Sequence, residues 1–89
     1  MLRITVHDKP GALAFQVEGR LAGPWVRVLE ECWQSSLAGQ RQPILRVDLT
    51  GVTFIEEAGK ACLAALHRQG AEFVAADCLT KAIVAEITQ

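Results

Sequence analysis

The sequence predicts a small α/β domain in which helices cover mostly one face of a mixed β-sheet. Three observations lead to this fold class. The hydrophobic period changes repeatedly between two residues and about 3.6 residues, as it does where strands and helices alternate. Each of the first three predicted strands keeps a polar side, whereas strands covered by helices on both faces are usually apolar throughout. The chain has 89 residues, which is the size of one domain.

The chain begins with two strands joined by a tight turn. Apolar and polar side chains alternate over residues 1–7 and again over residues 13–19, as in half-buried strands. Between them, Pro10 and Gly11 stand in the order that a type II turn requires, because glycine permits the positive φ of the second central position. The two segments therefore predict a β-hairpin. The side chains expected to face its core side are Leu2, Ile4, Val6, Leu13, Phe15 and Val17.

A helix is predicted over residues 22–37, where apolar side chains recur at helical spacing along one face. Pro24 stands near its start, where a missing N–H costs nothing. Gly39 lies just beyond its expected end, as at many helix ends. Because one face of this helix must meet the sheet, we expect Trp25 and Trp33 in the core or half-buried beside it.

The second half of the chain alternates strands and helices. The remaining predicted elements are a strand over 44–51, a helix over 57–69, a short strand over 71–77 and a helix over 79–89. In the last helix Leu79, Ile83 and Ile87 recur every four residues, and Asp77 or Thr80 can cap its start. The predicted order is therefore β-β-α-β-α-β-α. Strand–helix–strand units of this kind normally give parallel neighbours through a right-handed crossover.

The composition argues against nucleic acid and membrane as direct targets. The net charge is −1 and lysine and arginine form no run, so the basic surface typical of nucleic-acid binding is missing. No apolar stretch is long enough to span a bilayer. The N-terminus lacks the apolar segment of a signal peptide. We therefore expect a cytoplasmic protein.

The chemistry-bearing residues predict neither a metal site nor a cofactor. The three cysteines, Cys32, Cys62 and Cys78, include no close pair and stand among apolar neighbours. We expect them to be small buried thiols in a reducing compartment, since a metal site needs more ligands at tighter spacing. The first predicted strand-to-helix junction also lacks the glycine pattern that cradles a dinucleotide phosphate.

The segment Glu56-Glu57-Ala58-Gly59 opens the second predicted helix. Two interpretations of its carboxylates stay open. They stabilise the helix start by meeting unpaired N–H groups and the positive end of the helix dipole, or they present fixed negative charge to a partner protein. Acid–base catalysis is disfavoured, because adjacent residues at a helix start diverge and no nucleophile or metal cluster completes a catalytic site. We therefore expect no enzyme.

The segment 47–77 resembles the central part of STAS domains, the family of bacterial anti-sigma factor antagonists and sulfate-transporter tails. The run Asp48-Leu49-Thr50-Gly51 matches the start of the family pattern, Phe54 and Ile55 match its apolar pair, and Gly59 matches its helix-opening glycine. Residues 17–33 are similar to the family's second strand and first helix. The resemblance covers nearly the whole chain.

This resemblance implies one STAS-like domain over residues 1–89. Its expected fold is the SpoIIAA-like βαβ superhelix, with a four-stranded mixed sheet and three helices mostly on one face. It also implies a non-enzymatic module that binds a protein partner, such as a serine kinase of the anti-sigma type. The residues that the resemblance assigns to partner binding are Asp48, Thr50, Glu56, Glu57, Ala58 and Gly59.

In the family, a kinase phosphorylates a hydroxyl in an Asp-Ser-Ser/Thr-Gly segment, and the added charge breaks the partner complex. Here Glu56 takes the place of the aspartate and Glu57 that of the first serine, while Ala58 replaces the phosphorylated residue. Alanine cannot accept phosphate, so we expect no switching by phosphorylation at this site. Two alternatives stay open. One is a cytoplasmic accessory subunit that supports the ATPase subunit of a lipid-transporting ABC transporter, and the other is a domain that binds a small ligand or nucleotide.

Overall fold

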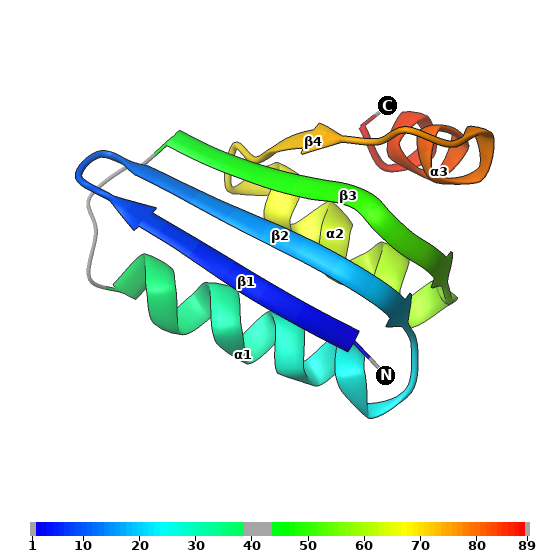
Figure 1. Cartoon of the computed structure of the whole chain (residues 1–89), viewed down its shortest axis with the longest axis horizontal. Coiled ribbons are helices and arrows are strands. Elements are labelled where there is room, and N and C mark those ends of the chain that lie inside the picture. The colour runs from blue at the N-terminus through cyan, green and yellow to red at the C-terminus, as the bar shows by residue number, and fades with distance from the viewer. Residues whose placement is uncertain (1, 39–43, 89) are drawn as a thin grey trace.

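The computed structural model describes residues 2–38 and 44–88 (Figure 1). The predicted order of elements is confirmed. The elements of the described chain are β1 (Leu2–Lys9), β2 (Ala12–Leu21), α1 (Pro24–Ala38), β3 (Ile44–Ile55), α2 (Glu57–Arg68), β4 (Glu72–Val74) and α3 (Cys78–Ile87).

The four strands form one mixed sheet in the order β1-β2-β3-β4. β1 is antiparallel to β2, whereas β2, β3 and β4 run parallel to one another. Lys9 pairs with Ala12, so Pro10 and Gly11 form the turn of the predicted hairpin. Gly11 has a φ of 77°, which is the backbone conformation that glycine permits at this position of a type II turn.

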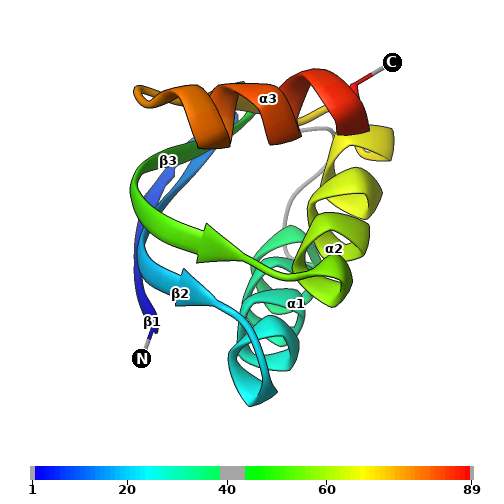
Figure 2. The same ribbon diagram turned by 90° about the vertical axis from the view of Figure 1, so that its right-hand side faces the viewer.

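The helices leave one face of the sheet uncovered (Figure 2). α1 and α2 lie side by side against the same face, and α3 lies beside β4, where it contacts α2 and β3. Among the described residues, no element covers the opposite face, which we call the open face. The predicted one-sided arrangement is therefore confirmed.

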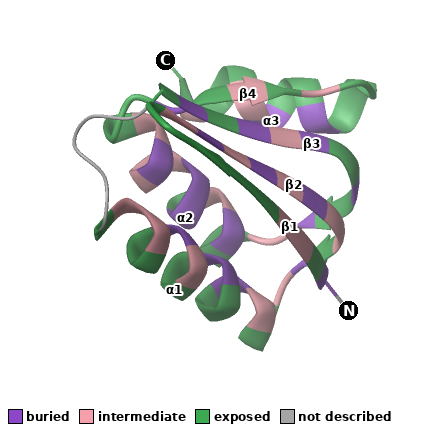
Figure 3. Cartoon of the chain, turned by 60° about the vertical axis from the view of Figure 1, so that its left-hand side comes forward, coloured by how far each residue is buried: buried purple, intermediate pink, exposed green. Residues whose placement is uncertain are grey.

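The core lies between the sheet and the two helices (Figure 3). The alternation predicted for the second and third strands is confirmed, because every second side chain is buried from Leu13 to Val17 and from Leu45 to Leu49. The central buried side chains are Leu13, Phe15, Val17, Val47, Leu49, Leu29, Leu63 and Leu66. Trp33 is buried and Trp25 half-buried, as predicted. On β1, which lies at the sheet edge, Leu2 is buried but Val6 is 38% exposed.

Three predicted strand lengths were wrong, and β2 continues to Leu21 instead of ending at Gly19. β3 continues to Ile55 instead of ending near Gly51, because shifts in its register against β2 let the pairing continue through an irregular stretch. A Cβ on Gly51 would lie 2.7 Å from Cγ of Glu18, so glycine gives the two strands room at the irregularity. β4 contains only residues 72–74, because it pairs with β3 over just three residues.

The face predicted for the last helix was partly wrong. Asp77 caps α3 by accepting a 2.7 Å hydrogen bond from the backbone N–H of Thr80, which selects one of the two predicted caps. With this start, Thr80 and Ile83 point inward, and Leu79 is 56% exposed. Residues three and four apart share a helix face, and Leu79 stands at the margin of the face centred on Thr80 and Ile83.

One cysteine differs from the prediction. Cys62 is buried and Cys32 is half-buried, and burial raises the pKa of both thiols. Cys78 is exposed, because it stands on the outer side of the first turn of α3. The described residues contain no cluster of His, Cys, Asp and Glu side chains suited to a metal ion. No described helix is both long and apolar enough to cross a membrane. Gly39, the predicted helix stop, lies outside the described residues.

The burial pattern predicts that two leucine truncations lower the free energy of unfolding by very different amounts. Leu49→Ala removes a fully buried side chain from the central sheet and should lower the free energy of unfolding by about 2–5 kcal/mol. Leu79→Ala truncates an exposed side chain on α3 and should change it by less than about 0.5 kcal/mol. Urea unfolding followed by circular dichroism measures both. Equal costs for the two variants would contradict the assigned core.

Candidate functional site

The carboxyl ends of β2 and β3 meet at one corner of the molecule (Figure 2). Leu21 and Ile55, the last residues of the two strands, are paired, and each strand leads directly into a helix. The N-termini of α1 and α2 therefore lie at the same edge, where open α/β sheets commonly place functional groups. We call residues 20–23 and 54–59 the β2/β3 corner.

Glu56 connects the two strand-to-helix junctions of the corner. Its backbone N–H donates to the carbonyl oxygen of Leu21 at 3.1 Å. Its side-chain Oε1 accepts a 2.7 Å hydrogen bond from the N–H of Gly23. Glu56 occupies the N-cap position of α2, yet its carboxylate makes no hydrogen bond to that helix. It lies instead at the start of α1, where the positive end of the helix dipole stabilises negative charge.

Glu57 carries the exposed charge of the corner. Its side chain is 89% exposed, and its Oε1 lies 3.2 Å from Nζ of Lys60. Lys60 also lies 3.5 Å from the Glu86 carboxylate on α3. The hydrogen bond and charge of Glu57, together with the charge of Glu86, raise the pKa of Lys60. Glu57 therefore presents its carboxylate to solvent beside one cation of its own helix.

Ala58 and Gly59 have opposite surroundings. Ala58 is exposed and offers no polar side-chain atom. Gly59 is buried, and a Cβ there would lie 2.9 Å from the carbonyl oxygen of Leu21 and 3.1 Å from Cγ2 of Ile55. Glycine at this position therefore lets the first turn of α2 approach the end of β2 closely.

Asp48 and Thr50 do not join the corner. Asp48 lies within β3, paired with Gln16 on one side and Val74 on the other. Its Oδ1 accepts hydrogen bonds from the hydroxyl of Thr50 at 2.7 Å and from the N–H of Thr50 at 2.9 Å. These two bonds lower the pKa of Asp48. The six residues assigned by resemblance thus separate into this strand pair and the four residues of the helix start.

The corner also holds an aromatic group that the sequence did not mark as a candidate for partner binding. Phe54 is 41% exposed, and the guanidinium carbon of Arg20 lies 4.9 Å from the centre of its ring. The available signal was the adjacent apolar pair of Phe54 and Ile55. Successive residues of a strand point to opposite faces, and Ile55 is buried, so one of the two had to face solvent.

The two glutamates should differ in their effect on stability. Glu56→Ala removes the acceptor for the Gly23 N–H and the charge at the start of α1, so we expect a loss of about 1–2 kcal/mol. Glu57→Ala removes an exposed ion pair and should cost less than about 0.5 kcal/mol. Urea unfolding compares the two variants. Amide hydrogen exchange at Gly23 should accelerate only in Glu56→Ala, and unchanged exchange there would contradict the assigned bond.

The close approach of α2 to β2 at Gly59 predicts that alanine at this position destabilises the fold. Gly59→Ala places a Cβ against the backbone of Leu21, so we expect the free energy of unfolding to fall by about 1–3 kcal/mol. At an unhindered helix position the same change would raise it by about 1 kcal/mol, because alanine is the better helix former. Thermal and urea unfolding report the sign. A stabilised variant would show that α2 and β2 are not in contact here.

Comparisons with known proteins show which fold this geometry belongs to. No protein-family profile matches the sequence, and no curated protein matches it. Among solved structures, an anti-sigma factor antagonist from Mycobacterium paratuberculosis superimposes with a TM-score of 0.82 and 23% identity, covering 96% of this chain and 76% of its own. An uncharacterized protein with a SpoIIAA-like fold from Shewanella loihica gives a TM-score of 0.59 and 17% identity, covering 89% of this chain and 71% of its own. The chain therefore has the SpoIIAA-like fold that its resemblance to STAS domains implied.

Proposed function

We propose that this protein is a non-enzymatic, cytoplasmic interaction module of the anti-sigma factor antagonist type, and that its protein partner binds the β2/β3 corner. The main support is that Glu57, Ala58 and Phe54 are all exposed at this corner. Further support comes from the superposition of 96% of the chain on an anti-sigma factor antagonist.

The side chains at the corner are better suited to binding a protein partner than to reacting with a substrate. An exposed aromatic ring with an arginine beside it is a common centre of binding energy at protein interfaces. Phe54 and Arg20 supply this pair, and Glu57 adds a charge that can select the partner. The small side chain of Ala58 lets a partner approach the first turn of α2. We propose a partner such as a serine kinase of the anti-sigma type.

Control by phosphorylation is not expected at the usual position. Ala58 has no hydroxyl, and the nearest threonines are already engaged. The hydroxyl of Thr50 donates to Asp48, and that of Thr53 donates to the carbonyl oxygen of Gly19 at 3.3 Å. Because the Glu56 carboxylate accepts from Gly23, Glu57 supplies the fixed outward charge. This charge is smaller than that of a phosphate group, which is about −1.5 to −2.

Site-specific cross-linking tests the proposed surface. A photo-activated amino acid placed at Ala58 should capture a specific partner in the native host, with mass spectrometry identifying it. The same amino acid at Val28, which is 44% exposed on α1, serves as the control and should capture nothing specific. Capture of an ATPase subunit at Ala58 would favour the accessory-subunit alternative. Specific capture only from Val28, or from neither position, would overturn the proposal.

A labelling experiment tests the missing switch. With the cognate kinase and radiolabelled ATP, the wild-type chain should stay unlabelled, whereas the Ala58→Ser variant should gain label at its introduced hydroxyl. Wild-type label on Thr50 or Thr53 would contradict the proposal. Circular dichroism should show the same fold for both proteins, since residue 58 is exposed.

A further inference from the structure

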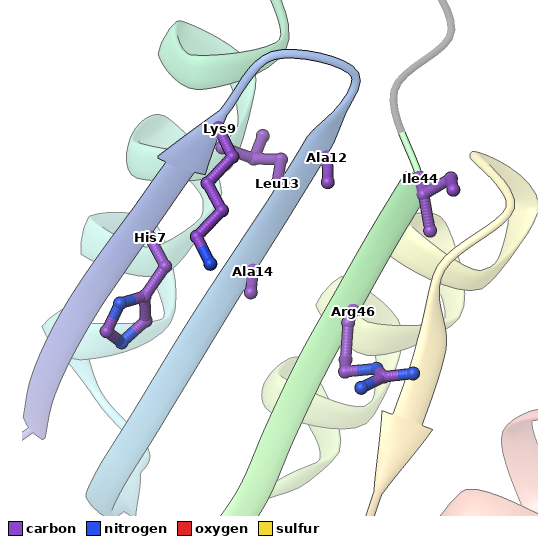
Figure 4. Close-up of a pocket in the computed structure, with 7 residues that line it drawn as sticks. All are labelled: His7, Lys9, Ala12, Leu13, Ala14, Ile44 and Arg46. Atoms are coloured by element: carbon purple, nitrogen blue, oxygen red, sulfur yellow. The ribbon is translucent and has the colours of Figure 1, made fainter.

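The open face of the sheet is hollowed at its hairpin end (Figure 4). The hollow measures about 420 Å³, which falls within the range of small-molecule sites. It lies at the opposite end of β2 from the β2/β3 corner. We call it the hairpin hollow and define it by His7, Lys9, Ala12, Ala14, Ile44 and Arg46.

The strand register explains why the hollow exists. Two rows of paired residues cross three strands, Lys9–Ala12–Ile44 and His7–Ala14–Arg46. In both rows the central strand contributes an alanine, so the middle is low while longer side chains stand on either side (Figure 4). Adjacent strands are about 4.8 Å apart, so the flanking strands are separated by roughly 10 Å. A carboxylate or phosphate group fits within this width.

The hollow is basic on both sides. Lys9 extends over it from β1, and Arg46 stands on β3 with its guanidinium turned toward β4 (Figure 4). None of the residues that line it is acidic. An acid of the neighbouring strand contacts Arg46: Oε2 of Glu72 on β4 lies 3.8 Å from its Nη2, and both side chains are more than half exposed. Such a long, exposed pair holds the guanidinium weakly and leaves its other N–H donors available.

The floor of the hollow is apolar. Ala12 and Ala14 are half-buried on the open face. On the β3 side of this floor, Ile44 adds a large apolar side chain that is 66% exposed. Apolar surface next to two cations matches a molecule with one charged end and a short hydrocarbon body, because the two parts would meet complementary surfaces at once.

We propose that the hairpin hollow binds a small organic anion, in which one carboxylate or phosphate group is attached to a short apolar body. Lys9 and Arg46 hold the charged group, Arg46 by turning its exposed guanidinium from Glu72 toward the hollow. Ala12, Ala14 and Ile44 contact the body. Arg46 matters more than Lys9, because its planar fork forms paired hydrogen bonds with such oxygens. This inference does not depend on the proposed partner surface, which lies at the other end of the sheet.

Nuclear magnetic resonance titration of the labelled chain tests the site. The probes are hexanoate, hexyl phosphate, acetate, inorganic phosphate and 1-hexanol. We expect shifts centred on residues 12–14 and 44–46, with hexanoate binding at least about fivefold tighter than acetate because its hydrocarbon is partly buried. The comparison of hexanoate with hexyl phosphate shows which charged group is preferred. Equal binding of hexanol, or shifts centred elsewhere, would overturn the proposal.

Matched variants separate a specific site from general charge attraction. Arg46→Gln should weaken hexanoate binding at least about fivefold. Arg3→Gln removes the same charge from the other end of the open face, so the hexanoate affinity should change less than about twofold. Glu72→Gln should strengthen binding, because it frees the Arg46 guanidinium. Equal effects of Arg46→Gln and Arg3→Gln would overturn the proposal. Because the Arg46 side chain is exposed, Arg46→Gln should have the same urea midpoint of unfolding as the wild-type chain.

Discussion

The parallel pairing of β2 with β3 is the constraint on which the rest of the structure depends. Both strands bury every second side chain against the same layer, from Leu13 to Val17 and from Leu45 to Leu49, so both following helices must cover that face. Because the strands are parallel and adjacent, their carboxyl ends and the two helix N-termini lie at one corner. The same pairing leaves the opposite face without cover and sets the alanines of β2 between the cations of β1 and β3.

Backbone N–H and C=O groups at the corner need hydrogen-bond partners, because two strands end and two helices begin there. Four N–H groups at each helix start lack a partner within the helix, and the chain leaves the sheet twice at this edge. Glu56 meets part of this need by joining the Leu21 carbonyl and the Gly23 N–H through its backbone and side chain. The structure thus separates the acidic pair: the Glu56 carboxylate is hydrogen-bonded within the fold, and that of Glu57 is exposed at the surface that we propose for a partner.

The alternation of apolar side chains was sufficient to predict the elements and the one-sided sheet, because burial on one face imposes the period directly. It was insufficient where long-range pairing decides the outcome. The irregular register that extends β3 to Ile55 depends on β2. The hydrogen bond from Gly23 to Glu56 joins residues 33 positions apart, so no local pattern reveals it. The hairpin hollow likewise needs the register of three strands, although its alanines and cations are visible in the sequence.

The two proposed sites are far enough apart to be occupied together. A standard interface takes about 800 Å² from each partner, roughly a seventh of the 5404 Å² surface of this chain. A round patch of that area extends about 16 Å from its centre. The corner and the hairpin hollow lie at opposite ends of the ten-residue strand β2, which spans about 30 Å at the usual rise per residue. A protein bound at the corner therefore leaves the hollow open, because the strand that joins the two sites also keeps them apart.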